Sequence, residues 1–137
     1  MAETIRKAQY FYITVPDNPG EGARALALLR DAGVNLLAFS GFPAGKRAQL
    51  DFVPENPGAF RAAAKKAKWK VVGPKVAFLV EGDDRTGVCA ELLGKLAAAK
   101  VNVTTTDAVV AGAGRFGAIV WVKPRDVNRA AKVLGAS

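Results

Sequence analysis

Two short turns of this chain place an aspartate, which can form ionic contacts, shortly before a predicted helix. The first turn reads Asp17-Asn18-Pro19-Gly20, and the second, 67 residues later, reads Asp84-Arg85-Thr86-Gly87. An aspartate can pair with an ammonium group, and the N-terminus of the helix expected after each turn offers free N–H groups to a carboxylate. Asn35 and Asn102, also 67 residues apart, add amides that can both donate and accept hydrogen bonds.

The two turns are part of an internal repeat. A shift of 67 residues gives nine identities between residues 11–36 and the second half of the chain, without a gap. Average composition predicts roughly one or two identities in such a window by chance. Residues 1–73 and 74–137 are therefore expected to be two copies of one unit, and Gly73-Pro74 is expected to separate them.

Residue periodicity predicts the elements of each copy. Tyr10–Val15 alternates as a strand does, whereas Ala25, Leu28, Leu29 and Ala32 recur as one face of a helix. The predicted order is βαββαβ in residues 1–73, with Trp69–Val72 as the last strand, and βαββα in residues 74–137. Residues 1–8 are expected to be a polar, frayed end. The second copy lacks a fourth strand, so we expect the other unit's sheet or a partner chain to fill the edge beside Lys75–Val80.

Composition limits the classes of function. The chain carries 20 Lys and Arg against 12 Asp and Glu, a net charge of +8, with one cysteine and no histidine. The absence of histidine removes the commonest general base and nitrogen ligand. With no nucleophile–base pair and no metal-ligand cluster, we expect no enzyme, no metal site and no cofactor. The apolar runs are too short to cross a membrane, and the single cysteine favours the cytoplasm. A Gly-x-Gly-x-x-Gly string at Gly112–Gly117 is followed by a strand and not a helix, so we interpret it as a hairpin turn.

The paired motifs resemble those of the ACT domain. The matching residues are Asp17-Asn18-Pro19-Gly20 with Gly33-Val34-Asn35-Leu36, and Asp84-Arg85-Thr86-Gly87 with Lys100-Val101-Asn102-Val103. The whole chain beyond its first eight residues looks like the small stand-alone proteins built from two tandem ACT units. The resemblance implies an α+β fold of two ferredoxin-like units, each an antiparallel sheet with helices on one face, the second without its last strand.

The resemblance also implies a function. ACT proteins of this kind are non-catalytic regulators that bind an amino acid or a related small metabolite where two ACT units meet, commonly in a homodimer. The first strand–helix turn and the start of the second strand hold the ligand in that family. The positions that correspond are Asp17, Asn18, Gly20, Asn35 and Leu36 in the first copy, and Asp84, Arg85, Gly87, Asn102 and Val103 in the second.

Other interpretations remain open. Asp17 and Asp84 could cap the helices that follow them, and the two asparagines could serve only the helix–strand junctions. The basic stretch from Arg61 to Lys75 could bind RNA or DNA, with Tyr10 and Tyr12 as stacking surfaces. A third alternative is an interaction module without a ligand.

Overall fold

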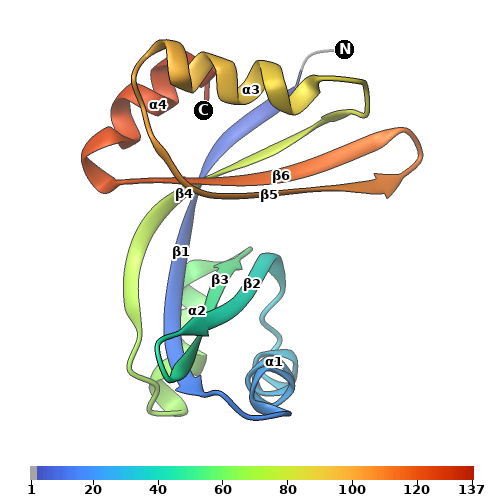
Figure 1. Ribbon diagram of the computed structural model, residues 1–137. Coiled ribbons are helices and arrows are strands. Elements are labelled where there is room, and N and C mark those ends of the chain that lie inside the picture. The colour runs from blue at the N-terminus through green and yellow to red at the C-terminus, as the bar shows by residue number, and fades with distance from the viewer. Residues whose placement is uncertain (1–2) are drawn as a thin grey trace. The chain divides into compact units, whose positions relative to one another are not determined.

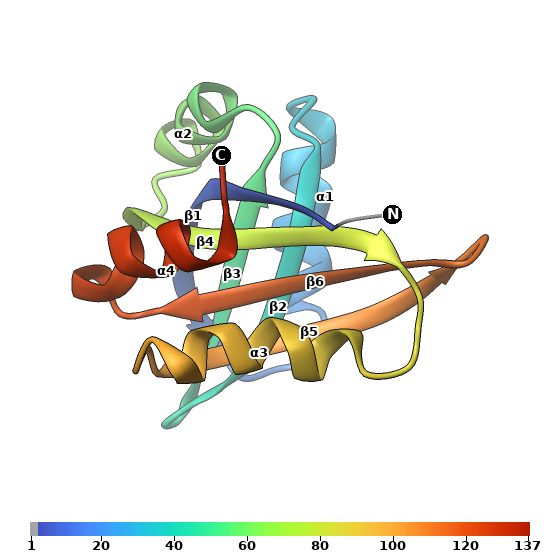
Figure 2. The ribbon, with the colours of Figure 1, turned by 90° about the horizontal axis from the view of Figure 1, so that it is seen from above.

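The computed structural model describes residues 3–137, which form two compact α+β units (Figures 1 and 2). We call residues 9–75 the first unit, and residues 3–8 together with 76–137 the second unit. Two long strands, β1 (Thr4–Pro16) and β4 (Val72–Asp83), contribute residues to both units.

The first unit places its strands in the order β2-β3-β1-β4, the order of a ferredoxin-like sheet. Between β1 and β4 the chain forms α1 (Glu21–Asp31), β2 (Leu36–Ala44), β3 (Arg47–Pro54) and α2 (Pro57–Lys66). The β1–β3 and β2–β3 pairs are antiparallel, with Phe11 opposite Phe52. Both aromatic rings lie against Phe60 of α2, at centroid distances of 4.9 and 5.4 Å. This core also includes Leu29 of α1, so both helices cover the same face of the sheet.

The second unit repeats this arrangement in the order β1-β4-β6-β5. Its remaining elements are α3 (Val88–Ala98), β5 (Val103–Gly112), β6 (Arg115–Val122), a short 3-10 turn at Pro124–Asp126, and α4 (Val127–Leu134). α3 and α4 lie on one face of the sheet (Figure 1). The predicted α+β fold of two ferredoxin-like units is confirmed.

The start of β1 occupies the strand position that the second copy lacks. The side chain of Ile5 is only 7% exposed and belongs to the second unit's core. Ser137 N donates to the Ile5 carbonyl, and Lys7 N donates to the Ser137 carbonyl, both at 3.1 Å. The expected frayed end is therefore wrong for residues 4–8. The reason is that a single apolar residue among polar neighbours can anchor a strand when its side chain enters a core.

Gly73 and Pro74, where the units were expected to separate, lie inside the continuous strand β4, and the division between the compact units falls between Lys75 and Val76. Gly73 has φ +131°, and a Cβ there would lie 2.8 Å from the Tyr10 carbonyl oxygen. This glycine permits a close approach of β4 to β1 within the first unit.

Candidate ligand-binding site

The turn after β1 presents an exposed aspartate in front of a helix. Gly20 takes the N-cap position of α1 in a left-handed conformation, with φ +91°. Asn18 N donates to the Pro16 carbonyl at 2.9 Å and closes the turn. The Asp17 side chain is exposed and forms no hydrogen bond with any residue from 3 to 137. The capping interpretation of Asp17 is therefore wrong, because glycine takes that position.

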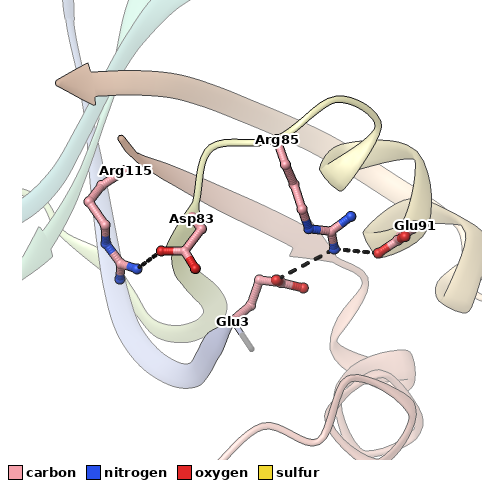
Figure 3. Close-up of polar contacts among 5 residues, drawn as sticks. All are labelled: Glu3, Asp83, Arg85, Glu91 and Arg115. Carbon is pink, nitrogen blue, oxygen red and sulfur yellow. Dashed lines mark hydrogen bonds and ion pairs between the residues drawn. The ribbon is translucent and has the colours of Figure 1, made fainter. Parts of the chain in front are cut away.

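The turn after β4 also ends on a left-handed glycine, but its side chains have a different environment. Gly87 takes the N-cap position of α3 with φ +82°, and Asp84 N donates to the Gly114 carbonyl at 2.8 Å. Arg85 lies between two carboxylates, those of Glu91 and, at 3.6 Å, Glu3 (Figure 3). The second turn therefore already pairs its arginine within the unit.

These ion pairs change the titration of the carboxyl groups. The hydrogen bond from Arg85 lowers the pKa of Glu91, and the hydrogen bond from Arg115, at 2.8 Å, lowers the pKa of Asp83. Both carboxylates thus stay ionised to a lower pH than ordinary acids, and the pairs hold the turn against β6 and α3 (Figure 3).

The two asparagines lie at the junctions before β2 and β5. Asn35 is exposed, its Nδ2 donates to Glu55 Oε2 at 3.5 Å, and its carbonyl accepts from Glu55 N at 2.9 Å. Asn102 is exposed and lines an open cleft. Leu36 and Val103, the next residues, are half-buried and pack against the cores of their units. The sequence offered no motif for Glu55, because its position beside Asn35 depends on strand pairing.

Each unit places its turn and its asparagine far apart. α1 has 11 residues, and at about 1.5 Å per residue it is roughly 16 Å long, with Asp17 before its start and Asn35 after its end. This length argues against a single small ligand that contacts both residues of one unit. Within a unit, the structure brings Asp17 near Gly20, and Asn35 near Glu55, but it does not bring the two groups together.

The helix ends explain another difference between the copies. Gly33 ends α1 with φ +74°, and Lys100 holds the corresponding position after α3 with φ +60°. Left-handed backbone suits glycine and costs other residues about 1–2 kcal/mol. The lysine at position 100, where the first copy has Gly33, therefore has a conformational cost.

The sheet of the first unit carries two tyrosines that neighbouring groups partly cover. Tyr10 and Tyr12 are half-buried, and the Lys75 ammonium lies 5.4 Å from the centroid of the Tyr12 ring. Asp51, opposite Tyr12 in the register, is 5% exposed and accepts a hydrogen bond from Gln49 at 2.9 Å. Burial raises the pKa of Asp51, and it also raises the pKa of Tyr10.

Other motifs have structural explanations. The glycine string lies at the β5–β6 hairpin turn, between Gly112 and Arg115, as predicted. No group of three or more candidate metal ligands occurs among residues 3–137. In the same part of the chain, every helix is too short or too polar to cross a membrane.

Comparison with known proteins identifies the fold. No protein-family model matches the sequence, and no curated protein matches it. The regulatory subunit of aspartate kinase from Thermus thermophilus aligns over 98% of this chain and 96% of its own, with a TM-score of 0.67 and 16% identity. The chain folds as two ACT units.

Two further structures share the tandem ACT fold. Protein BT0572 from Bacteroides thetaiotaomicron has a TM-score of 0.80 at 16% identity, over 97% of this chain and 88% of its own. The regulatory subunit of aspartate kinase from Thermus flavus has a TM-score of 0.59 at 18% identity, over 98% and 94%. At these identities the likeness shows the fold.

Proposed function

We propose that this tandem ACT protein is a non-catalytic, cytoplasmic regulator that binds an amino acid or a related small metabolite. The observation that carries the proposal is the fold, which matches regulatory subunits of aspartate kinase over nearly their whole length. The exposed turn at Asp17 supports it, because a free carboxylate beside a helix N-terminus suits a ligand that has both an ammonium and a carboxylate group.

The first unit's turn is the stronger candidate of the two. The Asp17 carboxylate has no partner among residues 3–137, so a ligand ammonium could bind it without displacing a protein group. In the second unit, a ligand near Arg85 would compete with Glu3 and Glu91. The sites at Asp84 and Asn102 are therefore proposed to differ from the site at Asp17 and Asn35.

A second copy of the chain would complete the first unit's site. Because α1 separates Asp17 from Asn35, we propose that the turn of one copy and Asn35 of another hold one ligand in a homodimer. Exposed apolar residues on the outermost strands support association. They are Leu37, Phe39 and Phe42 on β2, and Val109 and Val110 on β5, at 37% to 67% exposure. Unpaired strand edges of this kind bind other chains readily.

Thermal unfolding against a panel of amino acids tests the proposal. A ligand at 100 times its dissociation constant adds about 2.7 kcal/mol to the free energy of unfolding. Asp17→Ala and Asn35→Ala should each abolish the shift and leave the protein folded, whereas Asp31→Asn, an exposed change at the end of α1, should keep it. If no amino acid raises the melting temperature at millimolar concentration, the sensor proposal is wrong. Salt-dependent binding of an oligonucleotide would then favour the alternative function, in which the basic stretch at Arg61–Lys75 binds RNA or DNA.

Mixing the two variants tests where the halves of the site come from. A dimer of one Asp17→Ala chain and one Asn35→Ala chain retains one intact site, formed by the unchanged residue of each copy. Ligand binding should therefore return in the refolded mixture, although neither variant binds alone. Absence of recovery, with dimers verified by light scattering, would refute the arrangement across two copies.

A further inference from the structure

The second unit contains an open cleft of about 630 Å³. It lies where β5 begins and β6 ends. Val103 pairs with Val122 there, so Asn102 and Lys123, the residues next to this pair, are neighbours at the cleft. All of its lining residues belong to the second unit; they are Lys100, Asn102, Lys123, Arg125, Asp126, Asn128 and Arg129. The cleft is thus complete in a single unit.

The charges around the cleft are strongly unbalanced. Its lining contains four cationic side chains and one carboxylate, that of Asp126. Asp126 is 7% exposed and pairs with Arg129 at 2.6 Å. The side chains of Lys100, Lys123 and Arg125 form no ion pair with any residue from 3 to 137. Like charges that converge on one hollow repel one another and attract a counter-ion.

The corresponding end of the first unit carries the opposite charge. There Leu36 pairs with Pro54, and the next residue, Glu55, contacts Asn35. Lys123 follows Val122 in the same way, so the two units place an acid and a base at one structural position. The cationic cleft is therefore a property of the second copy and not of the repeated fold.

Lys100 adds to this contrast. It takes a left-handed conformation where the first unit has Gly33, at a conformational cost of about 1–2 kcal/mol. Strained backbone conformations are concentrated at functional sites, and Lys100 combines such a conformation with a position in the lining of the cleft.

We propose that this cleft binds a compact oxyanion with two or more negative charges, such as the phosphate groups or clustered carboxylates of a small metabolite. Lys100, Lys123 and Arg125 supply the charge, and the amides of Asn102 and Asn128 can donate further hydrogen bonds. The Asp126–Arg129 pair fixes the start of α4 at the wall of the cleft. Because the second unit forms the whole cleft, anion binding there does not depend on the proposed amino-acid site at Asp17.

Titration calorimetry with pyrophosphate and with citrate, at constant ionic strength, tests the inference. We expect saturable binding with one site per chain. Lys123→Gln should weaken it on the order of tenfold, as loss of a hydrogen bond to a charged group does, and Arg125→Gln should act similarly. Lys123→Glu, which copies Glu55 of the first unit, should abolish binding. Lys132→Gln removes the same charge from an exposed position of α4 outside the cleft and should leave the affinity unchanged.

Three results would overturn the inference. The first is the absence of saturable binding of either anion at millimolar concentration. The second is an equal loss in Lys132→Gln and Lys123→Gln, which would show a general effect of net charge. The third is unchanged affinity in both Lys123→Gln and Arg125→Gln, with folding verified by circular dichroism. Tighter binding of pyrophosphate or of citrate, with the same dependence on Lys123, supports the cleft and assigns the anion to phosphate or carboxylate chemistry.

Discussion

Replacement of Ile5 by alanine should destabilise the second unit, although Ile5 lies far from that unit in sequence. The side chain is 7% exposed and packs in the core formed by residues of β4, β6 and the two helices α3 and α4. A buried methylene contributes about 0.8 kcal/mol, and isoleucine-to-alanine changes in cores cost about 2–5 kcal/mol with the cavity included. Since the end of a strand can relax into part of the space, we expect about 2–3 kcal/mol.

The effect can be measured by calorimetry and amide exchange. For a unit of this size, each kcal/mol lowers the melting temperature by about 4–8 °C, so the second unit should melt roughly 10–20 °C lower. Amides of residues 76–83 in β4 should exchange faster, because β1 is their neighbour. Lys7→Ala, an exposed change on the same strand, is the control and should shift the melting temperature little.

The comparison of these two variants decides between the sequence-based expectation and the structure. A frayed N-terminus predicts no difference between Ile5→Ala and Lys7→Ala. If both variants melt with the native protein and residues 76–83 remain protected, residues 3–8 do not complete the second unit.

Three further changes test the local physical arguments. Asp51→Asn should raise the melting temperature at pH 7, because burial disfavours the ionised carboxylate. The pKa of Asp51 is raised in the folded protein. Protonated Asp51 therefore stabilises the fold fully at a pH below its unfolded-state pKa, and this stability is lost as the pH rises through its folded-state pKa. The difference in melting temperature between the variant and the native protein should accordingly shrink in acid. Lys68→Gly, at φ +62°, should stabilise the first unit by about 1 kcal/mol in chemical denaturation, whereas Lys65→Gly inside α2 should destabilise it by about 0.5–1 kcal/mol. Gly73→Ala should destabilise the first unit strongly, since its Cβ would meet the Tyr10 carbonyl at 2.8 Å; normal stability of this variant would contradict the close approach of β4 to β1.

Most of the local order of elements could be predicted from the sequence because local patterns specify it. The strand expected at Trp69–Val72 was wrong, because β4 begins only at Val72 and continues to Asp83. The alternation at Tyr10–Val15 and the helical spacing at Ala25 and Leu29 describe faces that the structure buries. Arg115–Val122 is a strand with the predicted bounds. The burial of Ile5 in the second unit's core and the continuity of β4 through Gly73 could not be predicted in this way, because both depend on contacts with residues distant in the chain.

The candidate site shows the same division. The duplicated turns and asparagines, from Asp17 to Asn102, can be read from the repeat, because a 67-residue period preserves residue types at equivalent positions. The sequence by itself thus determined two ferredoxin-like copies and the positions at which they differ. Only the tertiary structure decided that Arg85 pairs with Glu3 and that Lys123 joins Lys100 at one cleft. The physical reason is that strand pairing brings these residues together, and strand pairing is not a property of one short stretch of sequence.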